Sequence, residues 1–446
     1  MKSLVLLFTT LFFSISAFSQ VPKGDRILAW QVDLAESGNY DSSFLYAKQA
    51  CMESLHLFYP WNDVEDSLGR FNSGFMDARL SPANVYYPAF GTKVELQLAP
   101  INSGTKTVPK DLKNVKFNDA KMISRFKVFL DTIFSRIPQV ELSVLNIGNE
   151  HDARLGGDSM KYVEYKEFLD SVFPYARKLY AKNHAGNFKT GTTFTYHGLT
   201  SFPSAPFCWE VNNSCDVVST TYYPLNNDFT MKDPTVVLPD FKVLVSIYSS
   251  LTKPIYFAEC GYSSSTLCKS SEKKQADFYS NVFMAWDSLY DHIKYITLFK
   301  TNDWSSAQVE QIAPFYGLGK DTIFKEYLRT LGVRTWDGNG KSKMAYNTIL
   351  CELESRSWCS VKCPITDIDE LVNHQEVYLY PNPVIDHVII SNVNNIESVR
   401  VYNNLGELVL LSNYNKIDVE NLPRGIYIMN IVTLDKSIKQ IKFLKI

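Results

Sequence analysis

Short apolar runs alternate with amphipathic helical stretches along most of this 446-residue chain, and no other feature restricts its possible folds so strongly. Eight runs have the apolar, β-branched and aromatic content of strands, and helical stretches separate them between Arg26 and Leu331. These runs are residues 27–32, 56–61, 93–98, 142–150, 188–196, 216–223, 254–258 and 295–299. Strands joined by helical crossovers pair in parallel, so the pattern indicates an α/β protein.

Eight regular strand–helix units favour a closed (β/α)8 barrel, the TIM barrel, over residues 20–355. A doubly wound open sheet is the competing architecture. It rarely contains eight regular units, however, and it needs a glycine-rich first turn if it is to bind a nucleotide. No such motif follows residues 27–32. The barrel is therefore the expected fold of the large domain.

The sequence changes character after Ser355. Residues 356–375 are polar and have the composition of a linker. Residues 376–446 contain no long helical pattern, and turn signals such as Pro423-Arg424-Gly425 separate short alternating runs. This pattern is typical of a small all-β sandwich, so a second domain is expected over residues 376–446.

The N-terminus has the features of a secretory signal peptide over residues 1–19. Lys2 precedes an apolar run from Leu4 to Phe13, and Ala17-Phe18-Ser19 provides a small-x-small cleavage pattern. The run is too short for a membrane span, and no later segment is long and apolar enough for one. We expect an exported, soluble mature protein without a stable membrane span.

Export makes the eight cysteines candidates for disulfides. At least two disulfides are expected. Cys208 with Cys215 and Cys260 with Cys268 are close enough in sequence to close single loops, and Cys351, Cys359 and Cys363 crowd the end of the large domain. Cys51 lies in a helical pattern and is expected to be a buried free thiol. Neither cysteines nor histidines have zinc-ligand spacing, so we expect no metal and no cofactor.

Composition narrows the range of partners. A net charge of -2 and a pI near 6.4 leave no basic surface of the kind that binds nucleic acid. Aromatic residues reach 14%, which suits a sugar-binding cleft, although the core of a large barrel accounts for most of them. We expect a monomer whose partner is a polysaccharide or oligosaccharide.

Two glutamates stand at strand ends, Glu150 at the end of residues 142–150 and Glu259 directly after residues 254–258. A strand buried on both faces does not accommodate a carboxylate, so each is expected to face a cleft. Strands four and seven of a closed ring of eight face each other across its mouth. Two such carboxylates can divide the work of glycoside hydrolysis, one as proton donor and the other as nucleophile or base.

At these positions the large domain resembles the retaining glycoside hydrolases of clan A. Gly148-Asn149-Glu150 matches the clan's strand-four motif, which implies that Glu150 is the acid/base and that Asn149 donates to the sugar 2-hydroxyl. Glu259 falls where the clan places its nucleophile. Tyr222 or Tyr223 matches the strand-six tyrosine that orients this nucleophile.

The sequence also departs from the clan's pattern. The second strand ends in residues 59–63 and lacks the arginine that many members carry nearby. Trp304 is either the clan's platform tryptophan or a packing residue, because an indole at a loop is often half buried. Trp61 follows a proline at a strand end, which favours a position at the cleft rim. His197 closes the fifth strand and is a substrate-binding candidate, with a structural histidine as the alternative.

The C-terminal domain resembles the sorting domain of type IX secretion over its whole length. The resemblance rests on Tyr380-Pro381-Asn382-Pro383, on residues 401–406, on residues 422–427 and on the basic-apolar alternation of residues 436–445. It implies transport across the outer membrane by the type IX secretion machinery. Release or anchoring at the outer cell surface would follow.

These observations predict a secreted or cell-surface glycoside hydrolase that cleaves β-glycosidic bonds with retention and acts within the polysaccharide chain. The alternative is a surface polysaccharide-binding protein whose barrel has lost its chemistry. The presence of both Glu150 and Glu259 argues against it, because lost activity usually shows first as a changed catalytic residue. The sequence does not determine which sugar is the substrate. Residues 222–224 and 258–262 loosely resemble those of endo-galactanases, while β-mannanases and β-glucanases share the same framework.

Overall fold

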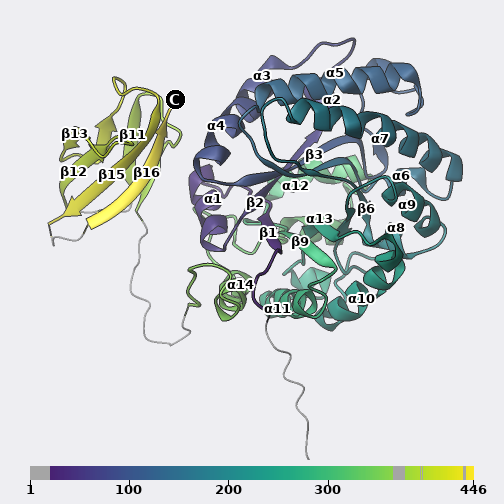
Figure 1. Cartoon of the computed structure of the whole chain (residues 1–446). Helices are drawn as coiled ribbons and strands as arrows, with labels where there is room; N and C mark the ends of the chain where they lie inside the picture. Colours follow the sequence, from purple (N-terminus) through teal and green to yellow (C-terminus); the bar gives the residue numbers. More distant parts are fainter. Residues whose placement is uncertain (1–20, 365–376, 392, 394, 435–437) are drawn as a thin grey trace, which may run out of the picture.

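The computed structural model describes residues 21–364, 377–391, 393, 395–434 and 438–446 (Figure 1). The expected signal peptide and most of the expected linker lie outside these residues. Eight parallel strands close a barrel, because the first and last strands pair with each other and the remaining neighbours pair in sequence order. The strands are β1 (Ile27–Trp30), β2 (Ser54–Pro60), β3 (Lys93–Asn102), β5 (Leu142–Asn149), β6 (Lys189–Thr195), β7 (Val218–Tyr222), β8 (Ile255–Cys260) and β9 (Ile293–Leu298). The predicted barrel is confirmed.

Helices surround the barrel and bury their apolar faces against it (Figure 1). In α5 (Ala120–Arg136), Asp119 caps the N-terminus, and the buried residues recur every three or four positions. The other helices up to the end of the barrel are α1 (Tyr40–Gln49), α2 (Trp61–Val64), α3 (Ser73–Phe75), α4 (Ser81–Ala89), α6 (Asp152–Leu155), α7 (Ser159–Tyr180), α8 (Tyr196–Thr200), α9 (Ala205–Asn212), α10 (Val237–Tyr248), α11 (Glu272–Ser288), α12 (Ser306–Ile312), α13 (Thr322–Arg329) and α14 (Met344–Ser355). A π-helical turn, Met76–Leu80, joins α3 to α4.

The centre of the barrel is polar, although barrel interiors are usually filled by branched apolar side chains. Glu95 of β3 accepts a hydrogen bond from Asn146 Nδ2 at Oε1 and one from Thr297 Oγ1 at Oε2, both at 2.8 Å, and His56 Nδ1 lies 3.4 Å from the same Oε2. All four side chains are buried. A buried carboxylate is tolerated here because each oxygen has a donor.

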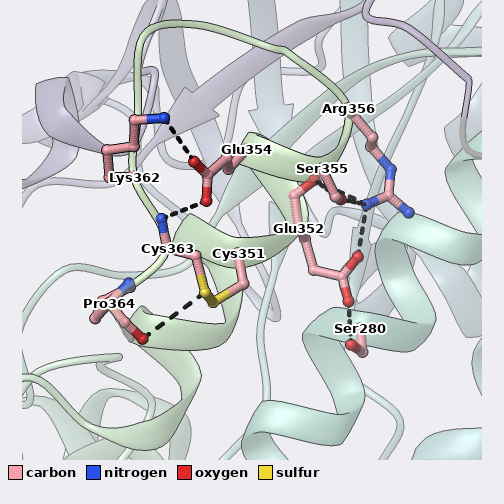
Figure 2. The surroundings of a disulfide bond; sticks show 9 residues. All are labelled: Ser280, Cys351, Glu352, Glu354, Ser355, Arg356, Lys362, Cys363 and Pro364. Atoms are coloured by element: carbon pink, nitrogen blue, oxygen red, sulfur yellow. Dashed lines mark hydrogen bonds and ion pairs between the residues drawn. A yellow bond between two sulfur atoms is a disulfide. The ribbon is translucent and has the colours of Figure 1, made fainter. Parts of the chain in front are cut away.

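Residues 356–364, expected as the start of a polar linker, pack on the barrel instead. Arg356 Nε forms a buried ion pair with Asp287 at 2.8 Å, and Trp358 packs on Trp286 with ring centroids 4.9 Å apart. The segment is also fixed by polar contacts around Cys363, whose backbone N–H donates to Glu354 Oε2 at 2.8 Å (Figure 2).

Two disulfides are present, which confirms the prediction of at least two, but the pairing differs from the expected one. Cys351 pairs with Cys363 (Figure 2) and Cys51 pairs with Cys359. Cys51, expected as a free thiol, thus ties the end of α1 to the segment after α14. The four cysteines expected to close single loops are buried free thiols, namely Cys208, Cys215, Cys260 and Cys268. The thiol of Cys268 lies against the carbonyl of Ile323 at 3.6 Å rather than against Cys260.

The C-terminal region forms two antiparallel sheets, as the sequence predicted. One contains β10 (Tyr378–Tyr380), β11 (His387–Ser391) and β14 (Lys416–Asp418), and the other contains β12 (Ile396–Tyr402), β13 (Leu408–Ser412), β15 (Gly425–Thr433) and β16 (Ile438–Lys445). Apolar residues of both sheets, such as Val388, Ile417 and Met429, share one core. Among the described residues of the whole chain, no helix combines the length and the apolar character that crossing a bilayer requires.

Candidate active site

Glu150 and Glu259 both lie at the C-terminal mouth of the barrel. Glu150 follows directly on β5, and its backbone is in the left-handed region with φ of 46°. Glu259 is the second-last residue of β8, and β6 and β7 separate β8 from β5 in the barrel. The two side chains are close enough to interact, since the negative charge of Glu150 helps to raise the pKa of Glu259.

Two alternate residues at the end of β7 bind the two carboxylates. Thr221 Oγ1 donates to Glu150 Oε1 at 2.8 Å, and Tyr223 OH donates to Glu259 Oε2 at 2.6 Å. Alternate residues of a strand point to the same face, so both side chains enter the barrel mouth. Tyr222 lies between them and points outward, where its hydroxyl donates to Asp240 of α10 at 2.8 Å. Of the two tyrosines that the sequence left open, Tyr223 contacts the glutamate.

A short hairpin after β3 contacts Glu150 and Asn149 from the other side. It joins β3 to β4 (Thr105–Lys106), and Ser103 at its turn donates to Glu150 Oε2 at 2.7 Å. Asn149 is buried, its Nδ2 donates to Asn102 Oδ1 at 3.1 Å, and its Oδ1 accepts from Gln97 Nε2 at 2.8 Å. The amide and the carboxylate of the strand-end pair are therefore both held in fixed orientations.

The surroundings of Glu259 disfavour its ionised form. Burial raises its pKa from 4.5 to about 7, with the charge of Glu150 as the second cause. His56 and the hydrogen bond from Tyr223 oppose this rise. A group at the mouth of a barrel with its pKa moved toward neutrality is suited to acid–base or nucleophilic work.

An aromatic cluster from the segment after β9 covers the side of the site next to Glu259. Tyr327 of α13 packs edge-on against Tyr223 with ring centroids 5.9 Å apart, and Phe324 contacts both Phe229 and Tyr316. After burial, the charges of both glutamates are the main causes that raise the pKa of the Tyr316 and Tyr327 hydroxyls. Tyr316 keeps 39% of its surface exposed, so the cluster reaches the surface of the protein there.

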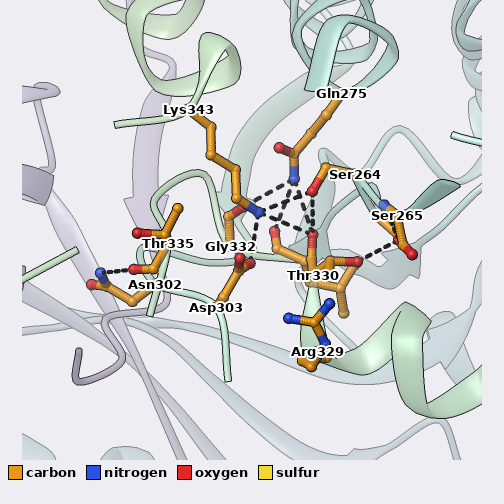
Figure 3. A network of polar contacts seen from close by, with 12 residues as sticks. Ser264, Ser265, Gln275, Asn302, Asp303, Arg329, Thr330, Gly332, Thr335 and Lys343 are labelled. Carbon is orange, nitrogen blue, oxygen red and sulfur yellow. Dashed lines mark hydrogen bonds and ion pairs between the residues drawn. The ribbon is translucent and has the colours of Figure 1, made fainter. Parts of the chain in front are cut away.

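A buried polar network fixes the segment after β9 (Figure 3). Lys343 Nζ forms an ion pair with Asp303 at 2.7 Å and donates to the carbonyl of Gly332 at 2.8 Å and to Ser264 Oγ at 3.0 Å. Gln275 Nε2 donates to the carbonyl of the same Gly332 at 3.0 Å. Since Ser264 belongs to the loop after β8, the network fixes the aromatic cluster relative to Glu259.

The three remaining predicted site residues differ in where they lie. Trp61 is fully buried, packs on Phe126 and Phe129 of α5, and donates from Nε1 to Glu65 Oε2 at 2.9 Å. The expected position at the cleft rim is wrong, because α2 begins at Trp61 and turns the indole toward the helix layer. Its place is in the core.

Trp304 and His197 stay near the barrel mouth. Trp304 is half-buried, and the Lys300 ammonium lies 3.3 Å from the centroid of its ring. Lys300 is itself fully buried with Asp33 at 3.2 Å, and burial lowers its pKa to about 8. His197 is exposed in α8, immediately after β6.

Four residues around the two glutamates were not predicted from the sequence, namely Ser103, Thr221, Tyr316 and Tyr327. Only Thr221 had a usable signal, because it stands two positions before Tyr223 on one strand. No group of three or more His, Cys, Asp or Glu side chains within the described part of the chain is arranged to hold a metal ion.

Residues 378–445 match the family model of the secretion system C-terminal sorting domain. This domain directs type IX secretion to the cell surface or the extracellular space, which confirms the predicted location. No curated protein matches the chain.

Solved structures of glycoside hydrolases share the barrel fold. An exo-β-1,4-mannosidase from Opitutaceae bacterium strain TAV5 matches with a TM-score of 0.54 and 13% identity over 74% of this chain, which spans 59% of that chain. A GH5_18 protein from Bifidobacterium longum subsp. longum, in complex with Manβ1-4GlcNAc, matches with a TM-score of 0.56 and 12% identity over 76% of this chain and 80% of its own. A GH5_18 protein from Bifidobacterium longum subsp. infantis matches with a TM-score of 0.54 and 12% identity, over 74% and 78% of the two chains.

Proposed function

We propose that the protein is a secreted or surface-bound glycoside hydrolase that cleaves β-glycosidic bonds within a polysaccharide and retains the anomeric configuration. One observation carries the proposal. Two carboxylates, Glu150 and Glu259, lie at the C-terminal mouth of the barrel, and Thr221 and Tyr223 hold them from one strand end. Glycoside hydrolysis needs two such carboxylates, and barrel enzymes carry their chemistry at this face.

The proposed reaction has two displacements. Glu150 donates its proton to the glycosidic oxygen while Glu259 attacks the anomeric carbon, so the leaving sugar departs with its hydroxyl and a glycosyl ester forms on Glu259. Glu150, now ionised, takes a proton from water whose oxygen bonds to the anomeric carbon, and the ester bond to Glu259 breaks. Asn149 stands next to Glu150 and would donate to the sugar 2-hydroxyl. Tyr223 orients the Glu259 carboxylate through its hydrogen bond.

The structural neighbours suggest which sugars to test first. One neighbour is an exo-β-1,4-mannosidase and another is in complex with Manβ1-4GlcNAc, so β-mannosides are among the substrates to test first. The residues around Tyr223 and Glu259 suggest β-galactans as a second class of substrate, and β-glucans are the third class to test. Internal cleavage would appear as oligosaccharides of many lengths, whereas release of one small product throughout would indicate attack from a chain end.

The test is hydrolysis of β-linked mannans, galactans and glucans by the mature protein and by single-site variants. Glu150→Gln and Glu259→Gln should each lose several orders of magnitude in rate, because each removes a group that takes part in bond breaking. Glu141→Gln is the matched control, since Glu141 is exposed just before β5 and does not contact the site. Binding of a polysaccharide without any hydrolysis would favour the non-catalytic binding protein instead.

A further inference from the structure

Glu150 is held from two sides by hydroxyl groups that the two displacement steps do not themselves use. Ser103 Oγ donates to its Oε2 at 2.7 Å, and Thr221 Oγ1 donates to its Oε1 at 2.8 Å. Ser103 and Thr221 are both buried, with 8% and 3% of their surfaces exposed. They come from separate elements, the β3–β4 turn and the end of β7, so the carboxyl group is fixed in its plane rather than hinged at one contact.

The backbone conformation explains why Glu150 needs contacts on both sides. Glu150 has φ of 46° and Ser103 has φ of 48°, a left-handed conformation that is unfavourable for a residue other than glycine. The surroundings must therefore hold both residues in place. The Ser103 N–H donates to the carbonyl of Asn149 at 2.8 Å, and Asn102 accepts from the Asn149 side chain at 3.1 Å. The turn thus binds the strand-end pair through both backbone and side chains.

Each hydroxyl also occupies one lone-pair direction on its carboxylate oxygen. The proton that Glu150 delivers must then lie along a remaining direction, and a proton transfer is efficient only when donor and acceptor are aligned. Thr221 adds a second restraint, because its backbone pairs with Glu259 across β7 and β8. A shift of the strand end would move both carboxylates together.

We propose that Ser103 and Thr221 are positioning residues for the acid/base, which fix the Glu150 carboxyl so that its proton faces the leaving oxygen. This inference rests on the proposed function. A positioning role can be distinguished from a merely stabilising one. Loss of an aligned proton donor slows the reaction only for leaving groups that need a proton, whereas a loss of stability would affect all substrates alike. A dinitrophenolate leaves without a proton, whereas a phenolate leaves slowly unless it receives one.

The test compares kcat/KM for phenyl and dinitrophenyl β-glycosides of β-linked manno-, galacto- and gluco-oligosaccharides, with the oligosaccharide taken from the polysaccharide that the intact protein cleaves. Thr221→Val, which keeps the side-chain shape, and Ser103→Ala should each lose about 10- to 100-fold on the phenyl substrate, as expected for one hydrogen bond to a charged group. On the dinitrophenyl substrate the loss should stay below about threefold. Thr221→Ser restores the hydroxyl and should recover most of the phenyl rate. Ser219→Ala is the control, because the Ser219 hydroxyl lies on the same strand but pairs with Thr193 at 3.1 Å.

The outcomes separate this inference from the function on which it rests. Equal losses on both substrates, or no loss on either in variants that melt like the intact protein, would overturn the positioning role. If the intact protein cleaves the phenyl glycosides and Glu150→Gln does not, the proposed function stands and the failed prediction concerns Ser103 and Thr221 alone. If the intact protein cleaves none of the glycosides and none of the polysaccharides, the proposed function fails and this inference fails with it.

Discussion

At the scale of single residues, the two carboxylates of the site cannot be treated as independent acids. Burial and the charge of Glu150 raise the pKa of Glu259 to about 7, well above its ordinary value of 4.5. As the proposed nucleophile, Glu259 attacks only when it is ionised, so its raised pKa should set the lower pH limit of the reaction.

This raised pKa predicts the pH dependence of the reaction. On a dinitrophenyl glycoside, kcat/KM should rise as the pH rises through about 7, because Glu259 loses its proton there and becomes a nucleophile. This substrate reports on Glu259 alone, since its leaving group needs no proton from Glu150. The measurement is a pH–rate profile of the intact protein. A profile that is flat between about pH 5 and about pH 9 would contradict the raised pKa of Glu259.

Some of this detail was within reach of the sequence. Strand alternation puts Thr221 and Tyr223 on one face and Tyr222 on the other, but the sequence could not decide which face is inward, since Val217 and Val218 are both apolar. Trp61 was misplaced for a different reason. A helix that begins directly at a strand end turns its first side chain away from the mouth, and four helical residues leave little periodic signal.

At the scale of elements, the end of β5 next to the site depends on Gly148. Its φ is +94°, and a Cβ there would lie 2.3 Å from the hydroxyl of Tyr165. That hydroxyl donates to the carbonyl of Ile147 at 2.9 Å, so it cannot move without losing a buried hydrogen bond. The close approach of α7 to the strand end therefore requires glycine directly before Asn149 and Glu150.

Gly148→Ala should accordingly destabilise the protein by about 2–4 kcal/mol, from overpacking together with an unfavourable backbone conformation. Gly317→Ala is the matched control: its φ is +74° but no atom lies within 4 Å of the added Cβ, so it should cost only about 1 kcal/mol. Urea denaturation of both variants measures the difference. Equal costs would show that steric contact with Tyr165 has no influence.

The strands and helices of the barrel were predictable because each unit repeats the same two patterns, an apolar strand-like run and a stretch with apolar residues at helical spacing. The segment after β9 was not. It repeats neither period over a useful length, and its position follows from the contacts of Lys343 and Gln275 with backbone carbonyls. Contacts between a side chain and a distant carbonyl leave no pattern in a sequence, so Tyr316 and Tyr327 could not be assigned to the site.

At the scale of the whole molecule, the two disulfides fasten residues after α14 to the barrel, so the barrel domain extends past α14. Cys51 and Cys359 are 308 residues apart, so their bond closes nearly the whole barrel into one loop. Proximity in sequence suggested Cys260 with Cys268 instead. It misled because Cys260 is a fully buried strand residue, while the loop turns Cys268 toward α13.

We expect the barrel to fold and to hydrolyse its substrate without the sorting domain, provided that the chain ends at Pro364 and not at Ser355. The longer chain keeps both disulfides, whereas the shorter one loses Cys359 and Cys363. The loss of the long loop closure costs up to about 5 kcal/mol, so the shorter chain should melt several degrees lower. Thermal denaturation and an activity assay of both chains give the result. Failure of the longer chain to fold would show that the two domains depend on each other, and equal melting temperatures would show that the disulfides contribute nothing.

Proton NMR of the first product formed by the intact protein shows whether the reaction retains the anomeric configuration. A retaining site keeps its carboxyls roughly 5–5.5 Å apart, too close for a water molecule to attack between them. The β-anomer should therefore appear first, and the α-anomer should form only later, by mutarotation. With azide added, Glu150→Ala should form the β-glycosyl azide and Glu259→Ala the α-glycosyl azide. An α-anomer as the first product of the intact enzyme would contradict the assignment of Glu259 as nucleophile.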